Sequence, residues 1–214
     1  MSSGSVPEFP VILAPGLWAP GLVMKPLAAR LESAGLRCHT FGYRGRARPV
    51  EAHAERLARF ARALGPAHFV GHSLGGLVVL QALAGEPALE AGHVVLLGTP
   101  ANGCLAGRRL ARHPLGRWFL GESGALWNEG RSCRWERREP LGVLAGTVAL
   151  GLGRLFGTLP GPNDGVVRVE ETTVDGMRER VALPLGHSQM LFSARVAALV
   201  ASFLKDGRFG AAAR

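Results

Sequence analysis

Short apolar runs alternate with amphipathic segments along most of the chain. The apolar runs are rich in Val and Leu and predict strands, at residues 11–14, 37–43, 68–71, 93–97, 143–148 and 180–185. Apolar positions three and four apart predict helices at residues 21–34, 51–64, 74–84 and 189–204. Gly35, Gly65 and Gly85 follow the first three of these segments and are typical helix stops.

Strands that alternate with helices in this way predict an α/β fold. We expect a mostly parallel central sheet with helices on both faces, in a single domain that spans residues 1–214. In such a sheet the reactive loops gather at the carboxyl ends of the strands. Residues 101–140 depart from the alternation and read as an insertion after the fourth strand. The insertion is either a short cap or lid over the site or an ordinary packed excursion.

Composition narrows the class of protein. The 214 residues are 47% hydrophobic and 19% charged, which is typical of a globular domain. The net charge is +9, but the arginines are scattered, so we expect no nucleic-acid partner and leave peripheral lipid contact open. The oligomeric state stays open.

The cysteines and the chain start bear on the compartment. Three widely spaced cysteines argue against a disulfide framework and against a zinc site. The first ten residues lack the basic and apolar regions of a signal peptide, and no stretch resembles a membrane span. We therefore expect a cytoplasmic protein without integral membrane association.

Ser73 is the candidate nucleophile. It lies in the GxSxG sequence of residues 71–75, directly after an apolar strand and before an apolar helix. This context is that of a nucleophile elbow, in which a strained turn exposes the serine hydroxyl at a helix N-terminus. Gly71 and Gly75 relieve the crowding around the turn, and Gly76 lets the helix approach the sheet. A simple helix N-cap at Ser73 would need no glycine on both sides.

The acid and the base should follow the nucleophile in the order Ser, Asp or Glu, His. Asp164 lies in a turn-rich loop after the fifth strand and is the candidate acid, with Asp175 as its competitor. His187 is the one histidine after both Ser73 and Asp164, so it is the candidate base. His72, inside the elbow, should support the loop.

A tetrahedral oxyanion needs two backbone N–H donors. The elbow geometry assigns one to Leu74 and the other to the loop after the first strand, where we choose Leu17. Apolar residues near this loop and near the base are candidates for the substrate pocket, although each could equally be core. They are Trp18, Leu22, Met190 and Leu191.

The segments VILAPGLW, VGHSLGGLVV, HVVLLGTP, PNDGVV and LGHSQML resemble the α/β-hydrolase superfamily, and within it small bacterial esterases and lipases. The resemblance implies Ser73, Asp164 and His187 as catalytic triad, with Leu17 and Leu74 as oxyanion donors. The family commonly has His-Gly after the first strand, whereas this chain has Pro15-Gly16. A proline can stiffen the loop by fixing its own φ angle.

These features predict a serine hydrolase that cleaves carboxylic acyl esters, with a small ester or a lipid as substrate, through an acyl-enzyme at Ser73. No cofactor and no metal is implied. A thioesterase or an acyltransferase would use the same three residues, and a non-catalytic binding module would use the same fold. The serine at the elbow disfavours hydrolases that use an aspartate nucleophile.

Overall fold

The computed structural model describes residues 9–17, 21–123, 132–150 and 158–210. These residues form a six-stranded sheet with the order β2-β1-β3-β4-β5-β6, and every neighbouring pair is parallel. The strands are β1 (Val11–Ala14), β2 (Cys38–Thr40), β3 (Ala67–His72), β4 (Ala91–Leu97), β5 (Leu141–Gly146) and β6 (Glu179–Leu183). The parallel sheet predicted from the sequence is confirmed.

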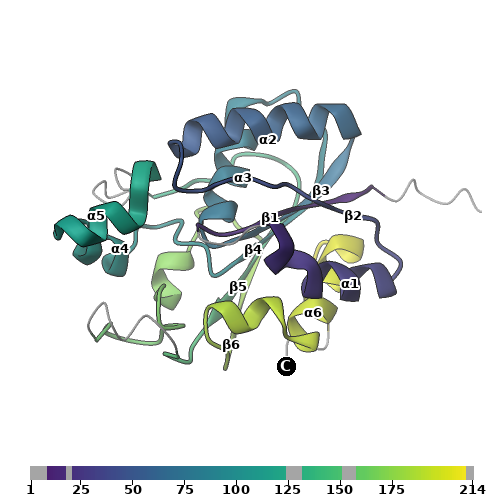
Figure 1. Cartoon of the computed structure of the whole chain (residues 1–214). Helices are drawn as coiled ribbons and strands as arrows, with labels where there is room; N and C mark the ends of the chain where they lie inside the picture. Colours follow the sequence, from purple (N-terminus) through teal and green to yellow (C-terminus); the bar gives the residue numbers. More distant parts are fainter. Residues whose placement is uncertain (1–8, 18–20, 124–131, 151–157, 211–214) are drawn as a thin grey trace, which may run out of the picture.

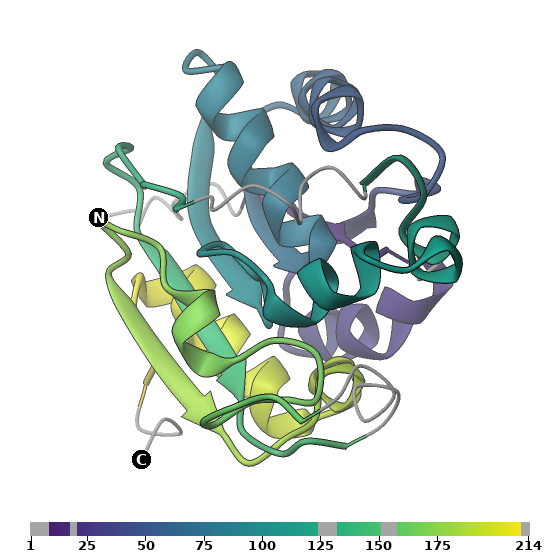
Figure 2. The ribbon, with the colours of Figure 1, turned by 90° about the vertical axis from the view of Figure 1, so that its left-hand side faces the viewer.

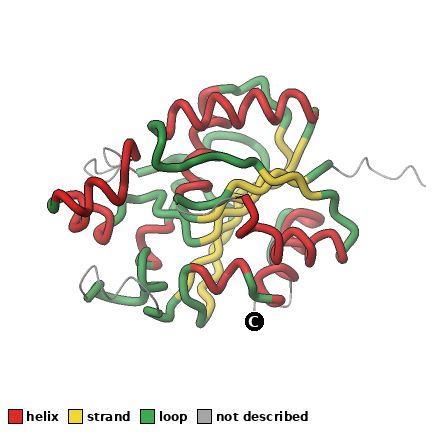
Figure 3. Tube along the Cα trace, in the orientation of Figure 1, coloured by secondary structure: helices red, strands yellow, loops and turns green. Residues whose placement is uncertain are grey.

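Helices connect the strands and cover both faces of the sheet (Figures 1 and 3). The α-helices are α1 (Lys25–Ser33), α2 (Val50–Leu64), α3 (Leu74–Gly85), α4 (Leu105–Ala111), α5 (Pro114–Leu120) and α6 (Ala194–Asp206). Short 3-10 helices are η1 (Gly21–Met24), η4 (Val169–Thr172) and η5 (Ser188–Leu191). Within the described ranges, no helix combines the length and the apolar character needed to cross a bilayer.

Two apolar clusters, one on each face of the sheet, make up the core. Successive residues of β1 alternate between them: Ile12 packs with α2 and α3, whereas Val11 and Leu13 pack with α1 and α6. This alternation follows from the two-residue period of a strand. Burial of each large aliphatic side chain contributes about 1.5–3 kcal/mol, so both helical layers are held to the sheet by the hydrophobic effect.

Strand β2 and the last helix depart most from the sequence pattern. Strand β2 ends at Thr40, because Phe41 and Tyr43 turn inward and stack at 5.4 Å in the core beneath α2. The predicted last helix is split into η5 and α6. Helix α6 begins after Ser193, whose hydroxyl caps it by accepting a hydrogen bond from the Val196 N–H at 3.3 Å.

The insertion after β4 contains α4 and α5, at the edge of the sheet where the strands end; Figure 2 shows both helices toward the viewer. Leu120 is buried in the core cluster, whereas Leu115 and Trp118 are exposed. The Arg46 guanidinium stacks over the Trp118 ring at 4.6 Å and donates a hydrogen bond to the Trp118 carbonyl. Helix α5 is thereby tied to the loop between β2 and α2. Residues 124–131 of the insertion lie outside the described part of the chain.

Candidate active site

Ser73 occupies the turn between β3 and α3, in a strained backbone conformation. Its φ and ψ angles are 54° and −124°, and it is the one non-glycine residue with a positive φ among those the structure describes. The Ser73 N–H donates to the Leu97 carbonyl at 2.9 Å, so the turn is fixed to the end of β4. Strain of this kind persists where the surrounding structure imposes it, as at a nucleophile elbow.

The three glycines of the elbow are packed against backbone or against a neighbouring strand. A Cβ atom on Gly71 would lie 2.4 Å from the Gly76 Cα atom. A Cβ atom on Gly75 would lie 2.1 Å from the Ala14 carbonyl oxygen, and one on Gly76 would lie 1.9 Å from the Thr99 hydroxyl oxygen. All three positions therefore exclude any side chain, in agreement with the roles expected from the sequence.

Asp164 is almost fully buried, with 1% of its surface exposed. One carboxylate oxygen, Oδ1, accepts the backbone N–H groups of Val166 and Val167 at 2.9 and 2.7 Å. The other oxygen, Oδ2, lies 2.7 Å from the Nδ1 atom of His187. The carboxylate is therefore held in place by its own loop while one oxygen faces the imidazole.

His187 is fixed by its backbone as well as by its ring. Its N–H donates to the Asp164 carbonyl at 3.0 Å, and its own carbonyl lies 3.1 Å from the Nε2 atom of His72. Gly98, at the end of β4, packs against the same pair, since a Cβ atom there would lie 3.0 Å from Asp164 Oδ2 and 3.1 Å from His187 Nδ1. A carboxylate accepts hydrogen bonds only, so the ring carries its proton on Nδ1 and leaves Nε2 as an acceptor.

His72 connects the elbow to the loop of the candidate base. A carbonyl accepts hydrogen bonds only, so the His72 Nε2–H donates to the carbonyl of His187. The two imidazole rings lie 4.8 Å apart between centroids. Burial, reinforced by the neighbouring His187 ring, lowers the pKa of His72 to about 3. His72 is therefore neutral at physiological pH and serves as a hydrogen-bond donor. The hydrogen bond joins two residues that are 115 positions apart, and no pattern in the sequence indicates it.

One predicted oxyanion donor lies within the elbow and the other in the loop after β1. Leu74 is the first residue of α3, and Leu17 follows β1. The Cβ position of Gly16 lies 3.2 Å from the Cβ atom of Ser73, so the loop after β1 runs directly beside the nucleophile. The role of Leu17 and Leu74 as donors remains a prediction.

The four pocket candidates fall into different environments. Met190 and Leu191 are 0% and 1% exposed and belong to the core cluster on the α1 and α6 side, so the core alternative accounts for both. Leu22 is 63% exposed. Trp18 lies outside the described residues.

Asp175, the competing acid, lies in a different environment from Asp164. Its side chain is 71% exposed and is 3.6 Å from the Arg134 guanidinium. An exposed ion pair of this kind contributes little to folding stability. Asp175 faces no histidine among the described residues. Of the two acids, the structure brings only Asp164 to His187.

The sequence as a whole matches one family model. The model, described as the alpha/beta hydrolase family, matches residues 11–199. This chain belongs to the alpha/beta hydrolase family. No curated protein matches the chain in sequence.

Solved structures show the same fold at low sequence identity. The mature form of a Bacillus licheniformis lipase superposes with a TM-score of 0.75 at 16% identity, over 95% of this chain and 94% of the lipase. The match to that lipase's propeptide form covers 48% of its length. A naproxen esterase from Bacillus subtilis superposes with a TM-score of 0.54 at 17% identity, over 94% of this chain and 85% of the esterase.

A pyrethroid hydrolase from Sphingobium faniae has the fold as well. It superposes with a TM-score of 0.59 at 17% identity, over 92% of this chain and 98% of the hydrolase. Family membership, together with esterase and lipase structural neighbours, supports hydrolase activity for this alpha/beta hydrolase. At sequence identities this low, the structural match shows that the fold is shared and does not identify the substrate of this chain.

Proposed function

We propose that this alpha/beta hydrolase cleaves carboxylic acyl esters through an acyl-enzyme at Ser73, with His187 as general base and Asp164 as its partner. The observation that carries the proposal is the buried Asp164–His187 hydrogen bond of 2.7 Å, on a histidine whose loop is bonded to the elbow residue His72. A buried carboxylate on one ring nitrogen leaves the other nitrogen to accept a proton.

In the first half of the reaction the Ser73 hydroxyl oxygen attacks the ester carbonyl carbon. The hydroxyl proton passes to His187 Nε2, and the Asp164 carboxylate stabilises the imidazolium that forms. The backbone N–H groups of Leu17 and Leu74 stabilise the negative charge on the carbonyl oxygen by hydrogen bonding. When the tetrahedral intermediate collapses, the C–O bond to the alcohol breaks, and the alcohol leaves with the proton from His187.

In the second half a water molecule attacks the acyl-enzyme. His187 takes one proton from the water, and the resulting hydroxyl adds to the acyl carbon through a second tetrahedral intermediate. Collapse releases the carboxylic acid and returns the proton to Ser73. The three side chains and the oxyanion donors are used in both halves, and water from the solvent is the second reactant.

Covalent labelling tests the proposal. A fluorophosphonate probe should modify the native protein once, at Ser73, and the label should be absent from Ser73→Ala. Ser33→Ala is the matched control, because Ser33 is exposed at the end of α1 and its hydroxyl donates to the Ala29 carbonyl at 2.9 Å. A folded native protein that resists the probe would instead favour a non-catalytic binding module.

Thioesterase and acyltransferase activities use the same side chains. A panel of p-nitrophenyl esters of increasing chain length, run beside matched thioesters and beside an added alcohol acceptor, separates the three. We expect kcat/KM to be highest for an oxygen ester in water. A preference for the thioesters, or transfer to the acceptor in place of hydrolysis, would replace the ester hydrolase with one of those alternatives.

The insertion of residues 101–140 is proposed as a cover over the site. The contacts between Arg46 and Trp118 support this proposal, since they attach α5 to the loop between β2 and α2. Trp118→Ala should remove the stacking and change the preference for acyl-chain length, whereas Leu115→Ala on the same helix is a control at an exposed position. The same chain-length preference in both variants would reduce the insertion to an ordinary packed excursion.

A further inference from the structure

A cavity of about 900 Å³ lies beside the predicted oxyanion loop. Leu17 forms part of its wall, together with the chain from Gly42 to Arg48 and the start of α2. The Cβ position of Gly45 lies 2.9 Å from the Leu17 carbonyl oxygen and 3.1 Å from the Leu74 Cδ2 atom. The cavity therefore adjoins Leu17, one of the two residues proposed to hold the oxyanion, and its volume is within the range of small-molecule sites.

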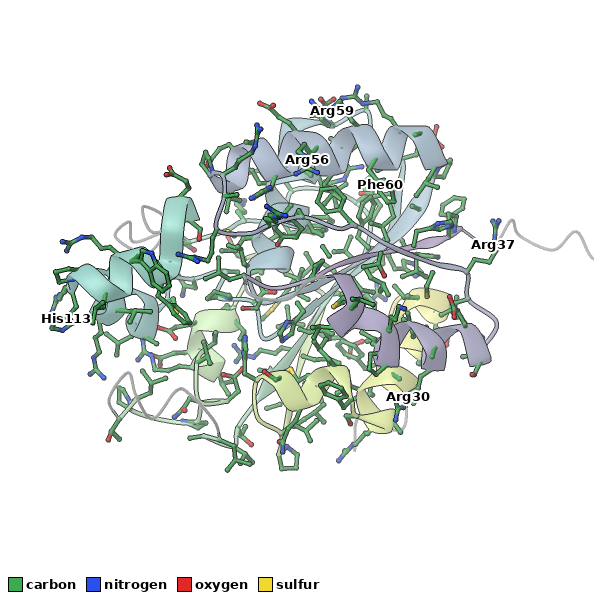
Figure 4. The ribbon with its side chains drawn as sticks, in the orientation of Figure 1. Arg30, Arg37, Arg56, Arg59, Phe60 and His113 are labelled. Carbon is green, nitrogen blue, oxygen red and sulfur yellow. The ribbon has the colours of Figure 1, made fainter. Side chains whose placement is uncertain are left out.

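The walls of this cavity are basic. Four arginines line it, Arg44, Arg46, Arg48 and Arg56, and none of the described lining residues is acidic. In the described part of the chain, no carboxylate lies within ion-pair distance of Arg44, Arg48 or Arg56. Arg56 extends from α2, where Figure 4 labels it, and its guanidinium lies 5.9 Å from the Phe41 ring. Positive groups gathered in one wall create a potential that attracts anions.

His53 adds a buried polar group to the same wall. It is 1% exposed, and both its ring nitrogens are buried, against the backbone of Gly45 and Arg44. Burial lowers the pKa of His53, and the Arg56 charge lowers it further. Hydrogen bonding to the backbone of Gly45 and Arg44 opposes this lowering, so the ring is positioned by the cavity wall itself.

We propose that this cavity binds an anionic group, a carboxylate or a phosphate, carried by the ester substrate. The inference rests on the proposed function for its link to catalysis and defines the substrate class further. Arg48 and Arg56 would supply charge-assisted hydrogen bonds to the anion. A neutral acyl chain would leave these groups in water or unpaired, so the enzyme should favour the charged ester.

Two esters with the same six-carbon acyl length test the substrate preference. They are p-nitrophenyl hexanoate, which is neutral, and the mono-p-nitrophenyl ester of adipic acid, which ends in a carboxylate. For the native enzyme we expect kcat/KM to be about tenfold higher for the charged ester. In Arg48→Gln/Arg56→Gln the ratio of the two kcat/KM values should fall by about tenfold or more. Arg59→Gln is the matched control, since Arg59 is an exposed arginine of α2 outside the cavity wall (Figure 4).

A binding measurement separates this inference from the catalytic proposal. Calorimetric titration of Ser73→Ala with inorganic phosphate and with adipate measures the affinity of the cavity for each anion without any turnover. Binding of either anion that weakens by about tenfold or more when Arg48 and Arg56 are also changed supports the inference, and the tighter anion identifies the group. Circular dichroism and thermal unfolding confirm that each variant is folded.

The outcomes are distinct for the two proposals. If the native enzyme hydrolyses neither ester while Ser73→Ala binds an anion through Arg48 and Arg56, the proposed function fails and the anion site stands. If the neutral ester is hydrolysed as well as the charged one and neither anion binds, the anion site is overturned while the proposed function stands. Equal behaviour of Arg48→Gln/Arg56→Gln and Arg59→Gln in both assays likewise overturns it.

Discussion

The Nδ1 atom of His187 lies 2.7 Å from the Oδ2 atom of Asp164, and the backbone N–H of the same histidine donates to the carbonyl of the same aspartate at 3.0 Å. The two residues therefore hold each other through side chains and main chain together. A ring held in this way has one orientation and one tautomer before any substrate arrives, which is the preorganisation that proton transfer requires.

Asp164→Asn should lower kcat by about 10⁴-fold, because an amide removes the negative charge that stabilises the imidazolium. The asparagine keeps an oxygen for the Val166 and Val167 N–H groups, so the loop should stay folded. Steady-state kinetics with a p-nitrophenyl ester measure the effect, and Asp175→Asn is the control. Full activity in Asp164→Asn together with a loss in Asp175→Asn would reverse the assignment of the acid.

His72→Leu should lower kcat by about tenfold and leave KM nearly unchanged, because the His187 carbonyl loses its donor and the base loses its anchor. His72→Gln restores an N–H donor near the Nε2 position and should recover most of the rate. A merely structural role would lower thermal stability equally in both variants without this difference in kcat. Similar kcat values in His72→Leu and the native enzyme would remove His72 as a positioning residue.

Gly75→Ala should destabilise the fold by about 3 kcal/mol, because its Cβ atom would lie 2.1 Å from the Ala14 carbonyl oxygen and 2.4 Å from that of Pro15. Both contacts are backbone atoms, so relief requires movement of the loop after β1. Gly85→Ala is the matched control at the other end of α3, where a Cβ atom meets nothing within 4 Å. It should be neutral or stabilise by about 0.5 kcal/mol in urea unfolding.

Stability should fall as the pH is lowered below 6.5. Burial lowers the pKa of His68 to about 4 and that of His72 to about 3, from an ordinary value of 6.5. In that window the unfolded chain binds these protons and the folded chain does not, so each histidine contributes a slope of up to about 1.4 kcal/mol per pH unit. The stabilisation is therefore fully present above pH 6.5 and is lost as the pH falls toward the folded pKa.

His68→Asn tests this slope. Asparagine offers an oxygen near the Nδ1 position, which accepts the His93 N–H at 2.7 Å, but it does not titrate. Urea unfolding between pH 5 and 6.5 should therefore show a shallower dependence in the variant than in the native protein. Parallel curves for the two proteins would mean that His68 takes up its proton equally in both states.

Much of the fold followed from local pattern, because each strand of a parallel sheet is a buried apolar run and each helix has one apolar face. Val11–Ala14 is predicted without error, and most other strand ends differ by one or two residues. The break at Ser193 was missed, since the apolar period continues across it. The order of the strands depends on which runs pair in space, and no local signal in the chain specifies it.

The candidate site, like the fold, could be predicted from the sequence only in part. Ser73, Asp164 and His187 could be chosen from motif and chain order, and the structure brings the last two together. The contact between His72 and His187, the packing of Gly98 against the base and the basic cavity depend on approach between distant segments. The apolar side chains of Met190 and Leu191 are equally compatible with a substrate pocket and with the core, and their burial decides for the core.

All six strands of the sheet are parallel, so the chain enters every strand at the edge of the sheet opposite the candidate active site. Gly35 and Gly65 lie in two of these entering turns, and a Cβ atom on either glycine would meet nothing within 4 Å. A fusion partner or an immobilising linker inserted at either turn would project away from the candidate active site. The molecule thus has a natural side by which it can be tethered to a support.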